Sequence, residues 1–230
     1  RSTPESSSAA SDVYKRQALM SPLDIIEEMN RQFDDAIITT DVGQHMMLVS
    51  QYAEITEKKQ LVMSGGLGTM GYGFPAAIGA QIGNPEKRVI AVSGDGGMQM
   101  NIQEFATAVL EETPVIACVF NNTYLGMVRQ WQKLFYGKRY GMTNLRAGAL
   151  SRRTDGAEFP EYTPDFVKLA ESYGAKGIRV TKTEEISAAF EEAKKNTKTP
   201  TLIEFIIDPE EMVYPMIKPG GTLEDMIMDC

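Results

Sequence analysis

The sequence predicts an α/β protein built on a doubly wound parallel sheet with helices on both faces. Two apolar runs, residues 89–92 and 115–120, are short enough to be buried strands of a parallel sheet. Between them, apolar residues recur at helical spacing from Met98 to Val109, and Pro114 ends this expected helix. Strands that alternate with helices along the rest of the chain are typical of such a sheet.

The other elements follow the same alternation. A helix is expected to begin at Ser21-Pro22, because proline suits the first helical turn and Leu23, Ile26 and Met29 fall on one face. The remaining elements are expected to be strands at 36–40, 60–63, 176–180 and 201–207 and helices around 74–78, 163–173 and 183–196.

Composition is that of a soluble globular protein. Of 230 residues, 43% are hydrophobic and 23% are charged, which suits one domain with a sizeable core. The serine-rich residues 1–17 are expected to be disordered or foreign to the domain, which should span residues 18–208 and be followed by a tail, 209–230. The net charge of −8 argues against nucleic acid and anionic membranes as partners.

Targeting and redox features are few. No apolar run approaches the roughly 18 residues of a membrane span. Two cysteines, Cys118 and Cys230, make no disulfide framework, so a cytoplasmic location is the default expectation.

Two polar turns follow the two apolar runs. The turn at 94–97 reads Gly-Asp-Gly-Gly, and the second run leads into Asn121-Asn122. Ligands of open α/β sheets bind beyond the carboxyl ends of the strands, so Asp95 and Asn122 could converge on one group. Carboxylate and amide oxygens are ligands that Mg²⁺ prefers, and a glycine turn that opens a helix suits phosphate. The pair therefore predicts a metal-held diphosphate, although either turn alone could be only a turn or a helix cap.

Two further segments should reach the same edge of the sheet. The strand at 36–40 delivers the next residues to this edge, among them His45, the only histidine, which spacing alone would leave as structural. Residues 64–73 hold five glycines around Met70, which indicates backbone that approaches something closely. The unpatterned stretch 141–164 is long enough to mark a lid. Its residues Arg146, Arg152 and Arg153 are expected to be solvated.

Five segments resemble the large, catalytic subunit of acetohydroxyacid synthase (acetolactate synthase), a family with the thiamine-diphosphate-binding fold. They read TTDVGQHMM, SGGLGTMGYGFPAAIGAQ, SGDGGMQMN, NNTYLGMVRQWQKLFY and PMIKPGGTLEDMI, and the resemblance runs from about Leu19 to the C-terminus. It implies thiamine diphosphate and Mg²⁺ as cofactors, with FAD in the full-length enzyme held mostly outside this chain.

The resemblance also assigns site residues. Asp95, Asn122 and the main-chain carbonyl of Tyr124 would hold the metal. The expected cofactor-binding residues are Val42, Gly43, Gln44, His45, Gly68, Met70, Gly94, Asp95, Gly96, Gly97, Asn122, Tyr124, Leu125, Gly126 and Met127.

Within that set the resemblance implies particular roles. His45 would donate to the diphosphate, Met70 would wedge under the thiazolium, and Met127 would lie beside the reactive carbon. Met46 stands where the family has a second glutamine after Gln-His. Spacing leaves Trp131 as core or site, and the match to Gln-Trp-Gln favours an active-site wall that selects the second substrate.

The implied reaction joins the two-carbon unit of pyruvate to pyruvate or 2-ketobutyrate in the biosynthesis of isoleucine, valine and leucine. The resemblance places the glutamate that activates the cofactor on an N-terminal domain, so this chain corresponds to about the last third of such a subunit and should be silent alone. It further implies a homodimer or tetramer and allows a small regulatory subunit.

Three alternatives remain open. The first is another thiamine enzyme, such as pyruvate oxidase, glyoxylate carboligase or a 2-keto-acid decarboxylase. The second is a cofactor-binding module without catalysis. The third, a nicotinamide-binding domain, needs G-x-G-x-x-G after the first strand, where this chain has Asp-Val-Gly-Gln.

Overall fold

The computed structural model describes residues 20–145 and 164–228. The expectations for residues 1–17, for the arginines of the 146–163 stretch and for Cys230 lie outside these residues. In the described part, no helix combines the length and apolar character needed to cross a bilayer.

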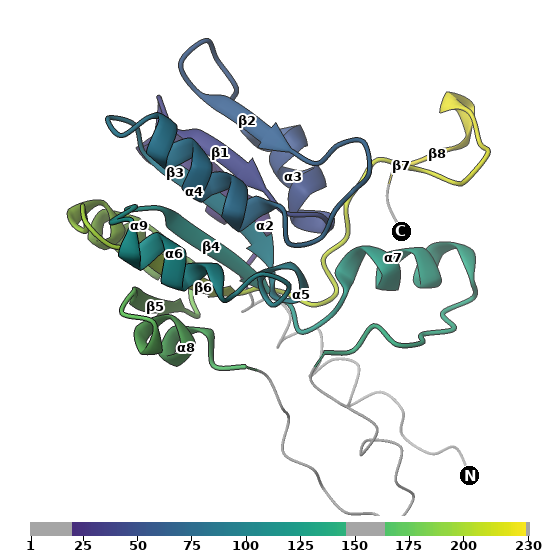
Figure 1. Ribbon diagram of the computed structural model, residues 1–230. Coiled ribbons are helices and arrows are strands. Elements are labelled where there is room, and N and C mark those ends of the chain that lie inside the picture. The colour runs from purple at the N-terminus through teal and green to yellow at the C-terminus, as the bar shows by residue number, and fades with distance from the viewer. Residues whose placement is uncertain (1–19, 146–163, 229–230) are drawn as a thin grey trace, which may run out of the picture.

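A six-stranded, fully parallel sheet forms the centre of the molecule (Figure 1). Its strands, in chain order, are β1 (Ile37–Thr40), β2 (Gln60–Met63), β3 (Val89–Gly94), β4 (Ile116–Asn121), β5 (Lys176–Val180) and β6 (Thr201–Ile206). Their order across the sheet is β2-β1-β3-β4-β6-β5. The chain therefore builds outward in one direction from β1 and in the other from β3, which places the topological switch point between these two strands. The predicted fold class is confirmed.

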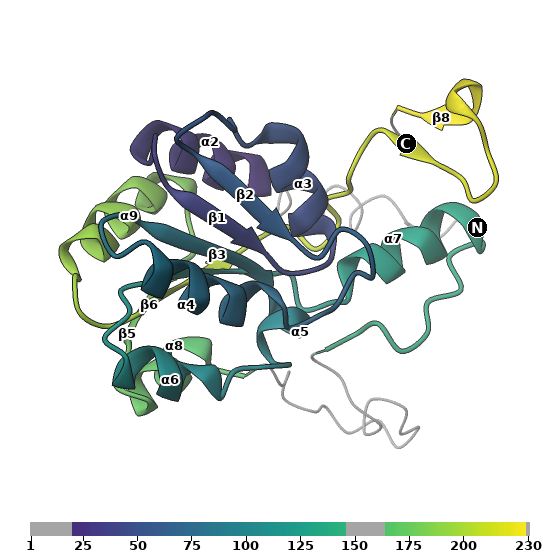
Figure 2. The same ribbon diagram turned by 45° about the horizontal axis from the view of Figure 1, so that its top comes forward.

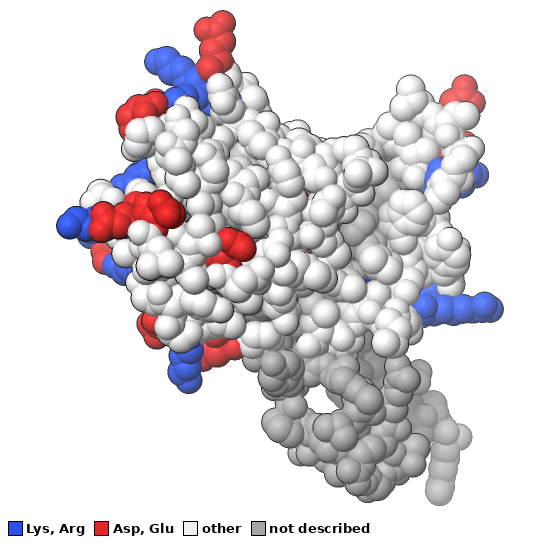
Figure 3. All heavy atoms as spheres, viewed as in Figure 1, with Lys and Arg blue, Asp and Glu red and all other residues white. Residues whose placement is uncertain are grey.

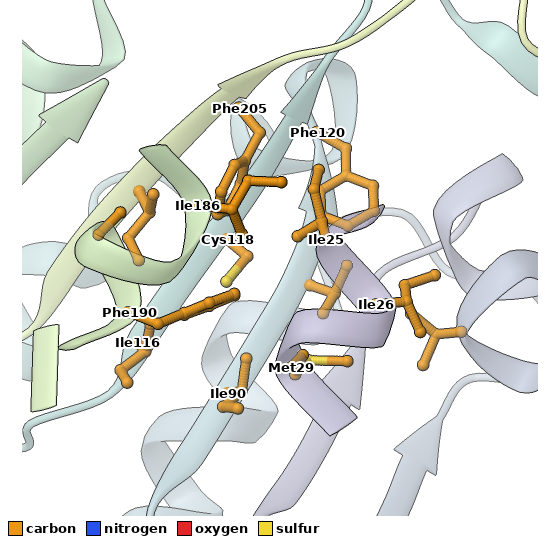
Figure 4. Packing of buried hydrophobic residues seen from close by; sticks show 14 of the residues in the cluster. Ile25, Ile26, Met29, Ile90, Ile116, Cys118, Phe120, Ile186, Phe190 and Phe205 are labelled. Atoms are coloured by element: carbon orange, nitrogen blue, oxygen red, sulfur yellow. The ribbon is translucent and has the colours of Figure 1, made fainter. Parts of the chain in front are cut away.

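Helices cover both faces of the sheet (Figure 2). On one face α2 (Pro22–Gln32), α3 (Gln44–Tyr52) and α9 (Ile186–Lys195) lie over a buried apolar cluster, and on the other α4 (Gly73–Gly83), α6 (Glu104–Leu110) and α8 (Phe166–Ser172) lie over a second. In Figure 4 the side chains of α2 and α9 converge on strand residues such as Cys118 and Phe120. Neighbours along a strand alternate between the clusters, as the pleat requires: Cys118 belongs to the first and Val119 to the second.

Local signals explain several element boundaries. Ser21 caps α2 by accepting a hydrogen bond from the Leu23 N–H at 3.3 Å, and Pro22 occupies the first turn as predicted. Asp165 caps α8 in the same way, through the Lys168 N–H at 3.2 Å.

The single helix predicted after the Gly-Asp-Gly turn is wrong. The structure instead has a four-residue helix, α5 (Asp95–Met98), a turn, and then α6. Gly96 and Gly97 have low helix propensity and the chain turns at residues 99–103, although Met98 and Phe105 on either side both reach the core. A helix as short as α5 has little macrodipole, so the positive charge at its N-terminus, which would attract a phosphate, is smaller than a full-length helix would provide.

Other differences are smaller. The helix predicted over 183–196 is a 3₁₀ turn, η2 (Thr183–Glu185), followed by α9. The prediction contained neither α3 nor the hairpin of β7 (Met216–Ile217) and β8 (Met226–Ile227), whose turn holds η3 (Leu223–Asp225). Beyond the carboxyl edge of the sheet, α7 (Gly126–Phe135) stands apart from the layers, and the C-terminal segment runs past it (Figure 1).

The stability of the α6 face depends on Phe105. This ring is fully buried, with its centroid 4.5 Å from that of Phe74, whereas Leu110 on the same helix is 81% exposed. Phe105→Ala should lower the free energy of unfolding by about 3–5 kcal/mol, because it removes a large buried side chain and leaves a cavity. Leu110→Ala, the matched control, should change it by less than about 0.5 kcal/mol. Urea unfolding followed by circular dichroism measures both, and equal effects would contradict this packing.

Candidate functional site

The carboxyl ends of β1, β3 and β4 surround one pocket. Thr40 pairs with Val92 and Gly94 with Phe120, so these strands end at a common edge. A pocket of about 280 Å³ opens there, at the switch point. It is bordered by all fifteen residues that the sequence analysis assigned to cofactor binding: Val42, Gly43, Gln44, His45, Gly68, Met70, Gly94, Asp95, Gly96, Gly97, Asn122, Tyr124, Leu125, Gly126 and Met127.

Asp41 connects segments that border this pocket, a role that sequence reasoning missed. Its buried carboxylate accepts hydrogen bonds from the backbone N–H groups of Gly71 at 2.8 Å and Gly73 at 3.1 Å. A Cβ on Gly97 would lie 2.4 Å from Asp41 Oδ1, so only glycine lets the Gly-Asp-Gly turn approach this carboxylate. The signal in the sequence was a carboxylate placed directly after a strand, among glycine-rich segments.

His45 lies in the first turn of α3, with its ring against Gly43 and Gly94. Burial lowers the pKa of the imidazole to about 4, against the opposing effect of the Asp41 charge, so the ring is neutral at neutral pH. Its Nε2 atom is buried and has no hydrogen-bond partner among the described residues. A neutral imidazole with its proton on this nitrogen could donate it to a ligand in the pocket.

Asp95 is the first residue of α5 and is only 4% exposed. Burial raises the pKa of its carboxyl group to about 7, and the backbone N–H groups of Gly96, Asp95 and Thr123 oppose this rise. The charged form therefore needs a partner, and a bound cation would supply one.

Asn122, in the turn after β4, borders the same pocket as Asp95. Its Oδ1 accepts a hydrogen bond from the Tyr124 N–H at 3.0 Å, and its Nδ2 lies 3.4 Å from Gln44 Oε1. No group of three or more His, Cys, Asp or Glu residues in the described ranges could hold a metal. A cation at this turn would therefore combine one carboxylate with amide and main-chain oxygens, and the remaining ligands would come from water or a bound phosphate.

Gln44 links the pocket to α7 and to the C-terminal segment. Its Nε2 donates to Gln130 Oε1 at 2.8 Å and to the Glu211 carbonyl at 3.0 Å. A Cβ on Gly126 would lie 2.0 Å from Gln44 Oε1, so the Gln44 side chain can approach the start of α7 this closely only because residue 126 is glycine. The buried Gln130 in turn makes two hydrogen bonds to the main chain of Val213, at 2.8 and 2.9 Å.

Arg129 strengthens the same junction. It forms an ion pair with Glu210 and donates to the Pro209 carbonyl at 3.2 Å. Its guanidinium carbon lies 4.5 Å from the centroid of the Tyr124 ring. Helix α7, which stands apart from the sheet, is thus held by the segment after β6.

Methionines and one tryptophan line the outer part of the site. Met70 borders the pocket with its methyl group next to Gly96, and Met127 borders it from α7. Trp131 does not border this pocket. It borders a second hollow, of about 520 Å³, that shares Met127 and Val128 with the first. Figure 3 shows an uncharged area between the sheet layers and α7, with charged side chains to either side.

Comparison with known proteins agrees with this geometry. A family model described as thiamine pyrophosphate enzyme, C-terminal TPP binding domain, matches residues 41–205. Among solved structures, the fold is similar to a thiamine diphosphate-dependent 4-hydroxybenzoylformate decarboxylase of Rhodococcus jostii RHA1. The TM-score is 0.70 at 26% identity, over 83% of this chain and 33% of that one.

Curated relatives are more similar in sequence. The acetolactate synthase large subunit of Corynebacterium glutamicum is 42% identical over 209 residues, which cover 90% of this chain and 32% of that protein. The isozyme 3 large subunit of Escherichia coli is 40% identical over 194 residues, covering 84% and 31%. The chain thus spans about a third of the length of the curated relatives that it matches. The resemblance to acetolactate synthase large subunits is confirmed, and the chain belongs to the thiamine pyrophosphate enzymes, as their C-terminal TPP-binding domain.

Proposed function

We propose that this chain forms the diphosphate-binding part of an acetolactate synthase large subunit and holds thiamine diphosphate through Mg²⁺. The observation that carries the proposal is the position of Asp95 and Asn122, which follow neighbouring strands and border one pocket at the switch point. Identity of about 40% to acetolactate synthase large subunits supports this activity over those of other thiamine enzymes.

The residues present fit both groups. Asp95 is a buried carboxylate whose charged form is poorly stabilised, and Asn122 Oδ1 keeps a second lone pair beside its bond to the Tyr124 N–H. The Tyr124 carbonyl completes the proposed set of metal ligands. His45 adds a buried, partnerless ring nitrogen that suits an anionic oxygen of a diphosphate.

Thiamine diphosphate, when bound, supplies the electron sink for breaking and making bonds next to a carbonyl. The chain's own part is to bind and orient. Asp95 and Asn122 would fix the metal, and His45 would position a phosphate oxygen without adding charge. Gly43, Gly94 and Gly97 leave room for close approach, while Met70 and Met127 would form apolar walls that exclude water from the reacting end.

The complete enzyme is proposed to act on small 2-keto acids in the cytoplasm, as a homodimer or tetramer. Pyruvate would supply the two-carbon unit, and pyruvate or 2-ketobutyrate would accept it, in the biosynthesis of branched-chain amino acids. FAD would bind to parts of the subunit other than the pocket described above, and a small regulatory subunit is a further proposed partner.

Removal of the Asp95 carboxylate tests the metal assignment. Asp95→Ala should weaken Mg²⁺-dependent binding of thiamine diphosphate at least tenfold, about 1.4 kcal/mol, because it deletes the only charged ligand proposed. Isothermal titration calorimetry measures the dissociation constant. Glu86→Ala, which removes an exposed carboxylate just before β3 at the opposite edge of the sheet, is the matched control. Equal affinity of Asp95→Ala and the parent would exclude the assignment.

The pKa of Asp95 predicts a pH dependence of stability in the absence of metal. The folded-state pKa of about 7 lies above the unfolded value of about 4. Between these two pH values Asp95 is therefore protonated in the folded state and ionised in the unfolded state. The free energy of unfolding should therefore fall as pH rises from about 4 to about 7, by up to roughly 4 kcal/mol, and stay level above.

Asp95→Asn isolates this effect, because it keeps the shape of the side chain and cannot ionise. Relative to the parent, the variant should be progressively more stable in metal-free thermal unfolding at pH 5, 6 and 7, and the difference should level off by pH 8. A parent and a variant whose melting temperatures keep a constant difference across this range would contradict a raised pKa of Asp95.

Trp131 tests the proposed reaction in the complete enzyme. Supplied with pyruvate and 2-ketobutyrate, the parent should form 2-acetolactate and 2-aceto-2-hydroxybutyrate. Trp131→Leu should reduce the preference for 2-ketobutyrate, because an apolar wall discriminates one methylene by about 1–3 kcal/mol. Chromatographic product analysis measures the ratio.

Other outcomes of that assay are informative. An equal loss of both products would make Trp131 a structural residue of α7. Release of acetaldehyde alone by the parent would instead support a decarboxylase, the activity named for the Rhodococcus structure.

A further inference from the structure

Glu204 is a buried carboxylate that the proposed reaction does not use. It lies on β6 in the interior of the sheet and is 2% exposed. In the strand register it is directly opposite Val119 of β4 on one side and Arg179 of β5 on the other. A buried charge is costly unless it is paired and hydrogen-bonded, so its partners indicate why the sheet retains it.

Each oxygen of Glu204 accepts one hydrogen bond. Oε2 accepts from Arg179 Nε at 2.7 Å, and Oε1 accepts from Asn121 Nδ2 at 2.7 Å. Arg179 is itself paired with Asp165 at 2.7 Å. The pKa of Arg179 is raised, first by its hydrogen bond to Glu204, so the guanidinium remains a cation in this network.

The bond to Glu204 determines which way the Asn121 amide points. A carboxylate can only accept, so the NH₂ group of Asn121 must face Glu204 and its oxygen must face away. That oxygen accepts a hydrogen bond from the Thr123 N–H at 3.0 Å. The Arg179–Glu204–Asn121 relay, defined by these three residues, thus ends at the backbone of the turn that follows β4.

This turn holds the proposed cation ligands in a strained conformation. Thr123 has a φ of +63°, the left-handed region that a β-branched residue rarely adopts. It lies between Asn122 and Tyr124, the two proposed ligands, and its N–H also lowers the pKa of Asp95 on the facing turn. The Thr123 carbonyl is held separately, by the Leu145 N–H at 2.9 Å.

We propose that Glu204, paired with Arg179, is a positioning residue for the cation site: it orients the Asn121 amide, which holds Thr123 in the left-handed conformation that presents Asn122 and Tyr124. This inference rests on the proposed function, because it concerns the geometry of the same metal-held diphosphate. Glu204 does not contact the turn itself and acts on it only through Asn121.

Glu204→Gln tests the relay with almost no change of shape. The glutamine has one oxygen for two donors, Arg179 Nε and Asn121 Nδ2. The arginine is a cation and the stronger competitor for that oxygen, so the new NH₂ group faces Asn121. Asn121 then turns its own oxygen toward Gln at 204 and places its NH₂ group against the Thr123 N–H, which loses the Asn121 oxygen as an acceptor.

The expected result is a weaker dissociation constant for Mg²⁺, by about 10- to 100-fold, in calorimetric titrations of the protein with thiamine diphosphate present. Thermal unfolding in the same buffer reports whether each variant is folded. Asn121→Ala removes the relay at its other end and should show a loss of the same order, so the test does not depend on one variant.

Rescue distinguishes orientation from general stability. In the double variant Glu204→Gln/Arg179→Met, the glutamine oxygen is free to face Asn121, so most of the Mg²⁺ affinity should return. Arg179→Met alone should keep near-parental affinity, although it leaves Glu204 less well paired and should lower the melting temperature. Arg179→Met should not rescue Asn121→Ala, which has no amide to orient.

The outcomes separate the two proposals. A parent protein without Mg²⁺-dependent binding of thiamine diphosphate would overturn the proposed function and this inference with it. A parent that binds, together with a Glu204→Gln variant that binds Mg²⁺ equally well, would overturn only the relay. Mg²⁺ binding that is weak in Glu204→Gln and stays weak in Glu204→Gln/Arg179→Met would also overturn the relay. A general loss of structure would not be reversed by Arg179→Met, whereas a misoriented Asn121 amide would.

Discussion

The hydrogen bonds of the buried Asp41 carboxylate are the interaction on which the site depends. Asp41 directly follows β1, yet it binds the backbone N–H groups of Gly71 and Gly73, 30 and 32 residues further along the chain. It thereby joins the end of the first strand to the start of α4 and forms the surface against which Gly97 rests. The glycine-rich segment 64–73 reaches this edge of the sheet because the Asp41 carboxylate satisfies two of its backbone donors, and the Gly-Asp-Gly turn packs against the same carboxylate because Gly97 has no side chain.

The site retains features that a purely structural edge would not favour. Asp95 is buried with a raised pKa, His45 Nε2 has no partner in the described part of the chain, and Thr123 has a left-handed backbone. Each of these costs free energy in the protein alone, and each would be compensated by a cation or an anionic oxygen in the pocket. Asp95 and His45 border one pocket, and Thr123 lies between two further residues that border it, which is the physical argument for binding.

Much of the fold could be predicted, because its signals are local. The apolar runs of β3 and β4, the Ser21-Pro22 start of α2 and the strands at 60–63 and 176–180 all follow from neighbouring residues. The break between α5 and α6 was missed because periodic core positions continue across it. Helix α3 was missed although His45, Leu48 and Val49 are buried at helical spacing, because its start was interpreted only as a binding segment.

The sequence by itself determined the strand ends, the Gly-Asp-Gly and Asn-Asn turns and, by resemblance, fifteen residues that lie around one pocket. These features belong to short segments, and because the strands are parallel, the segments that follow them lie at the same edge of the sheet. Only the tertiary structure decided the roles of Asp41, Gln130 and Glu204, and placed Trp131 at a neighbouring hollow. Their long-range partners are 25 to 86 residues away, as in the Glu204–Arg179 and Gln44–Gln130 bonds. Such pairs depend on strand register and on how α7 meets the C-terminal segment, which no local pattern specifies.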